Sequence, residues 1–157
     1  MSASHAPDAR PSGMLLACLL YPVGPAAIIL MPMIVGGLID SYGFSEQQAG
    51  NIAALEGLGL VFASILAAAW IRRVSWVKAL VVAFLGYAAL NILSANVDGY
   101  MSLLVLRCLT GLAGGSVFAV TVAALGDQPE PDRAFGFAQA VQGVMMLGGF
   151  LAAPWLV

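Results

Sequence analysis

Long apolar stretches decide what this chain can fold into. The first of them, from Met14 to Ile39, contains no charged residue, and about 20 consecutive apolar residues are enough for a helix to cross a bilayer. Four further apolar stretches follow, separated by short polar or charged segments. Across the chain, 61% of the residues are hydrophobic and only 9% are charged, against roughly 25% charged in an average soluble domain. This pattern excludes a water-soluble globule and predicts an all-α, polytopic membrane protein in a lipid bilayer.

Charged and turn residues divide the chain into a short tail and a transmembrane domain. The tail, residues 1–13, is rich in Ser, Ala and Pro and is expected to be disordered on the cytoplasmic side. The transmembrane domain should cover residues 14–157, with five spans at about 14–39, 46–71, 79–97, 100–126 and 134–157. Proline is tolerated in a membrane helix where neighbouring groups satisfy the freed backbone. The first span contains three prolines, so it is expected to be kinked.

The basic residues predict an orientation. With the expected spans, five of the six fall on one side of the membrane: Arg10, Arg72, Arg73, Lys78 and Arg133. The two loops on the other side hold no Lys or Arg. Cytoplasmic loops carry the positive excess, so we predict a cytoplasmic N-terminus in a bacterial inner membrane. The net charge of -2 offers no basic field for nucleic acid, and no nucleic-acid partner is expected.

Glu56 and Arg107 are the two charged residues well inside the spans. From the outer ends of their helices they lie about 13 Å and about 11 Å deep, at about 1.5 Å of rise per residue. Ionisable groups at such depths are costly and rarely face lipid, whereas an acid and a base at one depth can pair and offset part of that cost. We therefore predict an ion pair. It either locks two helices or opens when a solute or a proton arrives.

Three side-chain amides inside the spans are candidates for a substrate path. Gln139 and Gln142 stand three residues apart and so project from one face of the last span, and Asn51 lies in the second span. These amides either line a hydrophilic path or form interhelical hydrogen bonds, which contribute about 0.6 kcal/mol on average in membranes. Both interpretations remain open at this stage.

Small residues at intervals of four predict places where helices approach closely. Gly111 and Gly115 form such a pair in the fourth span, and Gly57 continues a series of alanines in the second. The segment from Gly111 to Gly115 lacks the Lys-Ser/Thr of a phosphate-binding loop. The sequence shows no Ser/His/Asp set, metal-ligand cluster or cofactor motif. No enzyme activity, metal or cofactor is therefore expected.

Taken together, these features resemble the N-terminal half of a major facilitator superfamily transporter. The resemblance rests on the Pro- and Gly-containing first span, the turn over 40–50, the basic loop after the second span, Arg107-x-x-x-Gly111, and the segment 131–136. It covers the chain from Met14 to its end. In this family each half of the molecule has six helices built from inverted repeats, and the substrate site lies between the halves. With five spans, the chain is expected to be a fragment or most of the N-terminal half.

The resemblance implies secondary active transport of a small solute by alternating access. Glu56 and Arg107 are then candidates for coupling or gating, and Asn51, Gln139 and Gln142 for contacts with the solute. The expected partners are the solute, a coupling proton or sodium ion, and the remaining helices of a full-length transporter. The Gly and Asp that members usually carry in the loop after the second span are absent here. The alternative is a small membrane assembly factor or subunit that packs against a larger partner.

Overall fold

The computed structural model describes residues 11–156, and its regular structure over that part of the chain is entirely helical. This confirms the all-α, polytopic fold class. The expected tail falls mostly on residues 1–10, which lie outside the described residues. Residues 11–13, also assigned to the tail, belong instead to the first helix, which begins at Pro11.

The first span is broken into three helices. These are α1 (Pro11–Leu20), α2 (Val23–Ile29) and α3 (Met31–Tyr42), and the axes of Met14–Ala26 and Met31–Tyr42 differ by 53°. Pro22 precedes α2, and Pro32 occupies the start of α3. Proline lacks the N–H that a helix interior needs and clashes with the preceding turn, so helices restart at these positions. The expected kink is confirmed.

Four long helices complete the structure: α4 (Glu46–Trp70), α5 (Trp76–Ser94), α6 (Tyr100–Gly126) and α7 (Pro131–Leu156). A short 3-10 turn, Ile71–Arg73, follows α4. All four are long and apolar enough to cross a membrane, and the bent row α1–α3 makes a fifth candidate if it counts as one span. Several bounds differ from the expected spans: the bent row α1–α3 covers residues 11–42, α5 runs from Trp76 to Ser94, and α7 already begins at Pro131.

The turn between α3 and α4 shows why a new helix begins at residue 46. Gly43 ends α3 with a φ of 65°, a left-handed conformation that glycine adopts without strain. The Ser45 hydroxyl then accepts a hydrogen bond from the Gln48 backbone N–H at 3.2 Å, while the Gln48 side chain accepts one from the Ser45 N–H at 3.0 Å. This reciprocal pair satisfies two backbone donors that a helix start leaves free.

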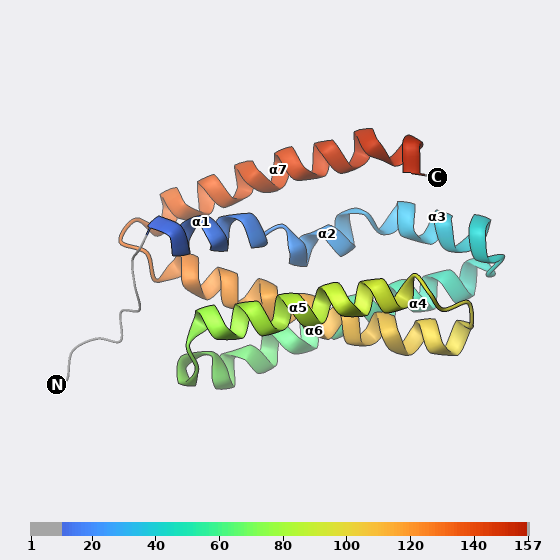
Figure 1. Cartoon of the computed structure of the whole chain (residues 1–157), viewed down its shortest axis with the longest axis horizontal. Helices are drawn as coiled ribbons and strands as arrows, with labels where there is room; N and C mark the ends of the chain where they lie inside the picture. Colours follow the sequence, from blue (N-terminus) through green and yellow to red (C-terminus); the bar gives the residue numbers. More distant parts are fainter. Residues whose placement is uncertain (1–10, 157) are drawn as a thin grey trace.

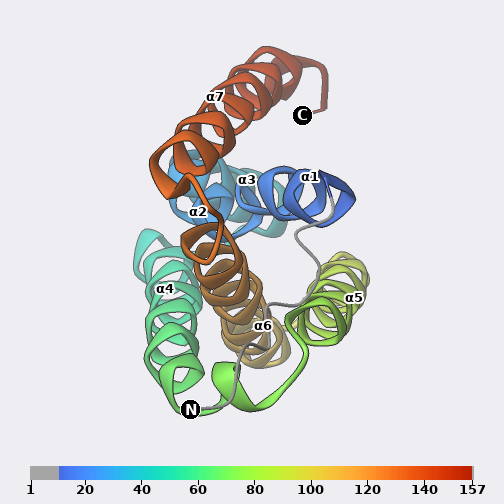
Figure 2. The same cartoon turned by 90° about the vertical axis from the view of Figure 1, so that its left-hand side faces the viewer.

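Helix α6 is the centre of the bundle. Viewed end on, α4 and α5 flank it, the row α1–α3 covers a third side, and α7 lies outermost, beyond α1 (Figures 1 and 2). Three hydrophobic clusters hold these helices together, joining α1 to α6 and α7, α3 to α4 and α6, and α5 to α6 and α1. The helix that carries Arg107 thus contacts every other span.

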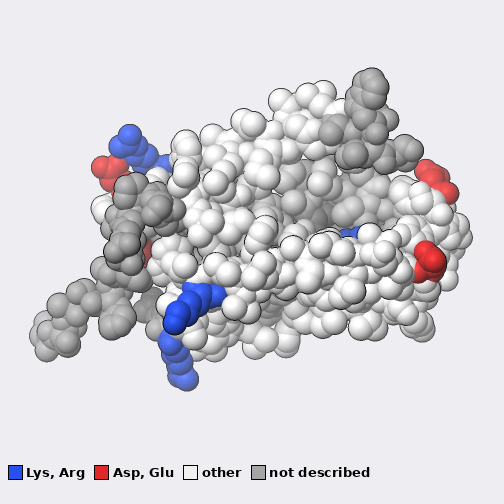
Figure 3. Space-filling model, viewed as in Figure 1, with Lys and Arg blue, Asp and Glu red and all other residues white. Residues whose placement is uncertain are grey.

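The outward faces of the helices are apolar. Val144 of α7 is 73% exposed, Val82 of α5 is 70% exposed and Ile65 of α4 is 67% exposed. Large apolar side chains facing outward from every span are what a lipid environment requires and water does not favour. Charges gather at the two ends of the bundle, with most basic residues at the end where α5 begins and acidic residues at both ends (Figure 3). The chain is an integral membrane protein.

Candidate functional site

Two glycines of α6 let α4 and α6 touch backbone to backbone. A Cβ atom built on Gly111 would collide with the carbonyl of Glu56, and one on Gly115 would collide with the carbonyl of Leu60. From the other helix, a Cβ on Gly59 would lie 2.6 Å from the carbonyl oxygen of Cys108. Glycine at these points removes the only atoms that would hold the helices apart. The structure therefore places Gly111 and Gly115 in a helix seam, as the sequence predicts.

The prediction for Gly57 is wrong. A Cβ at this position would meet nothing within 4 Å, so Gly57 does not belong to the seam. The buried positions of α4 form one stripe, in which each residue has another buried residue three or four positions away: Ala49, Ile52, Ala53, Glu56, Gly59, Leu60, Ala63 and Ala67. A strict interval of four from Ala49 drifts off this stripe and reaches Gly57 beside it. The seam glycine of α4 is Gly59.

Glu56 and Arg107 form an ion pair across this seam. The Arg107 Nη1 atom lies 3.8 Å from Glu56 Oε2, and the two side chains are 19% and 2% exposed. Gly111 stands one helical turn after Arg107 and contacts the backbone of Glu56 itself. The close approach that Gly111 allows therefore positions the acid opposite the base. The pair expected from equal depth is present in the structure.

The pair is loosely bonded. Its distance of 3.8 Å exceeds the range of about 2.7–3.2 Å for a hydrogen bond. Among the described residues, Glu56 Oε2 and Arg107 Nε are buried and have no hydrogen-bond partner. A buried charge is stable only with good geometry and satisfied hydrogen bonds. Glu56 Oε2 can thus still take up a proton or accept a hydrogen bond, and Arg107 Nε can still donate one to a water molecule or to an anionic group of a solute.

The three predicted amides lie at separate places. Asn51 donates to the Tyr100 hydroxyl at 3.4 Å, near the end of the bundle opposite the start of α5, and its side chain is exposed. Gln139 donates to the Tyr21 hydroxyl at 3.1 Å and so joins α7 to α1. The Oε1 atom of Gln142 is buried without a partner among the described residues. No hydrogen bond of the described residues joins these amides to the ion pair.

Sequence reasoning did not find several residues around the site. Tyr21 and Tyr100 are the partners of two of the amides, and no pattern in the sequence marks them as such. Tyr87 of α5 packs over Gly114, where a Cβ would lie 3.2 Å from its ring. Three glycines of α6 therefore allow close contact with two neighbouring helices, because Gly111 and Gly115 face α4 while Gly114 faces α5.

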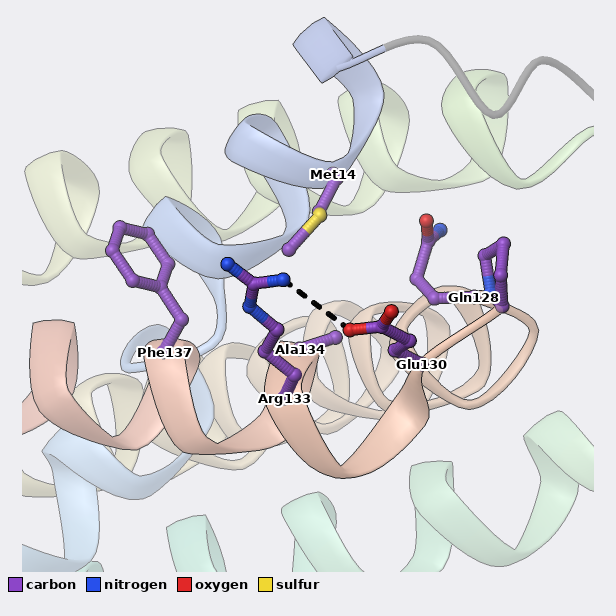
Figure 4. A pocket seen from close by; sticks show the side chains of 7 residues that line it. Met14, Gln128, Glu130, Arg133, Ala134 and Phe137 are labelled. Atoms are coloured by element: carbon purple, nitrogen blue, oxygen red, sulfur yellow. Dashed lines mark hydrogen bonds and ion pairs between the residues drawn. The ribbon is translucent and has the colours of Figure 1, made fainter.

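A pocket of about 730 Å³ opens at the start of α7, beside the start of α1. Met14 and Phe137 form its apolar wall, and Arg133 points toward Glu130 across its mouth (Figure 4). These two charges pair at 3.3 Å, with side chains 82% and 71% exposed. Exposed pairs of this kind contribute about 0–1 kcal/mol. This pocket is a surface feature separate from the buried pair.

A helical bundle of this kind, with a buried charge pair held in a glycine seam, is a polytopic integral membrane protein. Sequence similarity then narrows this class to a family. The family model of the Major Facilitator Superfamily matches residues 14–157, and the chain belongs to that superfamily. It is 28% identical over 134 residues to a gallate transporter of Pseudomonas putida, a match that covers 83% of this chain and 30% of that protein. The chain thus spans about 30% of the length of this relative. No solved structure matches. The family places the chain among membrane transporters and points away from enzymes.

Proposed function

We propose that this chain is the N-terminal part of a secondary active transporter that carries a small organic anion by alternating access. The similarity to a gallate transporter over 30% of its length suggests an aromatic carboxylate as the solute. A substrate site between two halves related by inverted repeats would then need helices beyond those described. The observation that carries the proposal is the buried, loosely bonded pair of Glu56 and Arg107.

The two members of the pair take different roles in this proposal. Arg107 is the more exposed side chain, and its planar guanidinium binds carboxylates with two parallel hydrogen bonds. When Arg107 turns toward a solute carboxylate, Glu56 is left as a lone buried charge, whose cost falls if it takes up a proton. Solute binding and proton uptake are thereby linked through one ion pair. Sodium at Glu56 is the competing coupling ion.

The amides would act on the path rather than in the coupling step. Within residues 11–156, Gln142 has a buried oxygen without a hydrogen-bond partner, and Gln139 and Asn51 bond to tyrosine hydroxyls that a passing solute could replace. We infer that these three residues contact the solute, on opposite sides of the membrane midplane. Their substitution should change the KM for solute more than the dependence on an ion gradient.

The test is transport by the protein from the complete reading frame, reconstituted in vesicles with labelled gallate as the probe. Glu56→Gln should keep exchange of internal for external gallate but lose acceleration by a pH gradient. Arg107→Gln should lose saturable uptake. Glu46→Gln is the matched control, because Glu46 is an exposed acid on the same helix. An unchanged response of Glu56→Gln to the pH gradient would refute the coupling role, and acceleration by a sodium gradient instead would identify sodium as the ion. Absence of flux for gallate and for other aromatic carboxylates would refute the solute class.

A further inference from the structure

A second groove, of about 790 Å³, lies on the outside of the bundle between α4, α5 and α6. Trp70 and Val74 close it on the α4 side, Lys78 and Val82 stand on α5, and Leu112 and Ser116 lie on its floor. This groove shares no residue with the buried ion pair or with the pocket at the start of α7. The function proposed above makes no use of it.

The groove runs from the membrane edge to the middle of the bilayer. Lys78 is in the first turn of α5, which begins at Trp76, and Trp76 packs in the same cluster as Leu125 near the end of α6. Ser116 lies ten residues before Gly126, the end of α6, which places it about 15 Å along the helix. Half the thickness of the hydrocarbon core is also about 15 Å. The groove therefore has the length of a single lipid leaflet.

The lining suits one acyl chain. Most of the side chains along it are aliphatic or aromatic. The hydroxyl on the floor, Ser116, already donates to the Leu112 carbonyl at 2.9 Å and presents no unsatisfied donor. An apolar channel of this kind would repel water and a polar solute but accept a hydrocarbon chain.

The mouth of the groove is positively charged. Lys78 lines it with an exposed side chain, and the exposed Arg73 ends the 3-10 turn that precedes α5. No acidic residue is among those that line the groove. A lysine at this height keeps its ammonium at the headgroup level while its stem stays in the apolar region. The charge at the mouth thus complements a phosphate that carries no compensating amine.

We propose that this groove is a binding site for an anionic phospholipid of the leaflet that the basic loop faces. One acyl chain lies along Val82 and Leu112 toward Ser116, and the phosphate is held by Lys78. Basic pockets between membrane helices bind anionic headgroups in this manner. Two other occupants are possible outcomes of the experiment: a zwitterionic lipid and another helix of the full-length protein.

The test places a photoreactive side chain in the groove of the protein from the complete reading frame. Val82→p-benzoylphenylalanine is reconstituted in phosphatidylcholine vesicles with a trace of radiolabelled phosphatidylglycerol, or of radiolabelled phosphatidylcholine for comparison. Val144→p-benzoylphenylalanine on α7 is the matched control site, because Val144 and Val82 are 73% and 70% exposed. Illumination attaches the label to whatever lies against each position.

At each position the measured quantity is the ratio of phosphatidylglycerol to phosphatidylcholine that is crosslinked. This ratio should be about fivefold higher at position 82 than at position 144, which is the effect of one basic residue near an anionic surface. Lys78→Gln should abolish the preference, and Lys78→Arg should keep it. Arg133→Gln, which removes an exposed charge from the first turn of α7, should leave the preference unchanged. Equal preference at the two positions, or a preference that survives Lys78→Gln, would overturn the proposal. Crosslinking of position 82 to protein instead of lipid would assign the groove to another helix and would also overturn it.

Discussion

Replacing Gly111 by alanine should destabilise the bundle, whereas the same change at Gly57 should not. In an exposed helix interior, Gly→Ala stabilises by about 1 kcal/mol through helix propensity. At Gly57 nothing opposes this gain, because a Cβ there meets no atom within 4 Å. At Gly111 the Cβ collides with the backbone carbonyl of Glu56, and neither backbone can rotate away as a side chain would.

The size of the effect follows from the repacking that the collision forces. Adding a methyl group to a tight interface costs about 1–3 kcal/mol, so after the propensity gain Gly111→Ala should lose up to about 2 kcal/mol. Gly57→Ala should gain up to about 1 kcal/mol. In Gly111→Ala, the added methyl group would also push α4 and α6 apart and lengthen the ion pair beyond its present 3.8 Å. Activity should therefore fall along with stability.

Thermal unfolding in detergent measures this difference through a native cysteine. The chain contains a buried cysteine, Cys18, which is 0% exposed, and a thiol-reactive fluorescent dye will label it only as the bundle opens. The midpoint for Gly111→Ala should fall below that of the wild type, and the midpoint for Gly57→Ala should equal or exceed it. If Gly111→Ala raised the midpoint as much as Gly57→Ala, the seam between α4 and α6 would not be as close as described.

Three further predictions follow from the pair, the loops and the length of the chain. In a double-mutant cycle, Glu56→Gln or Arg107→Gln alone should cost about 3–5 kcal/mol, and the double variant less than their sum; a coupling energy of zero would reject the pairing. In a cysteine-less background, an impermeant thiol reagent added outside should label cysteine placed at Gly43 but not at Ser75, and external labelling at Ser75 would reverse the proposed orientation. The chain reconstituted alone should show no saturable gallate flux, and flux that saturates would show that its helices suffice.

The helices could be predicted from the sequence because charge and apolar length mark them directly. The prediction of their ends was less accurate where a polar residue lies inside a helix. Lys78 suggested a loop, yet it sits in the first turn of α5, since a long basic side chain can reach the headgroups from within a helix. Asp132 likewise lies in the first turn of α7, where a carboxylate favours the positive end of the helix dipole. Hydropathy alone does not register either effect.

Equal depth in the membrane predicted the partner of Glu56 but did not predict partners for Gln139 and Gln142. The reason is the number of possible partners at each depth. One acid and one base lie well inside the spans, so equal depth leaves a single solution. An amide can bond to any hydroxyl, amide or free carbonyl at its level, and the choice then depends on helix rotation, which the sequence does not fix. Gln139 donates to Tyr21, while the buried oxygen of Gln142 has no partner in the part of the chain that the structure describes. Of the two, Gln142 is therefore the stronger candidate for direct contact with a solute.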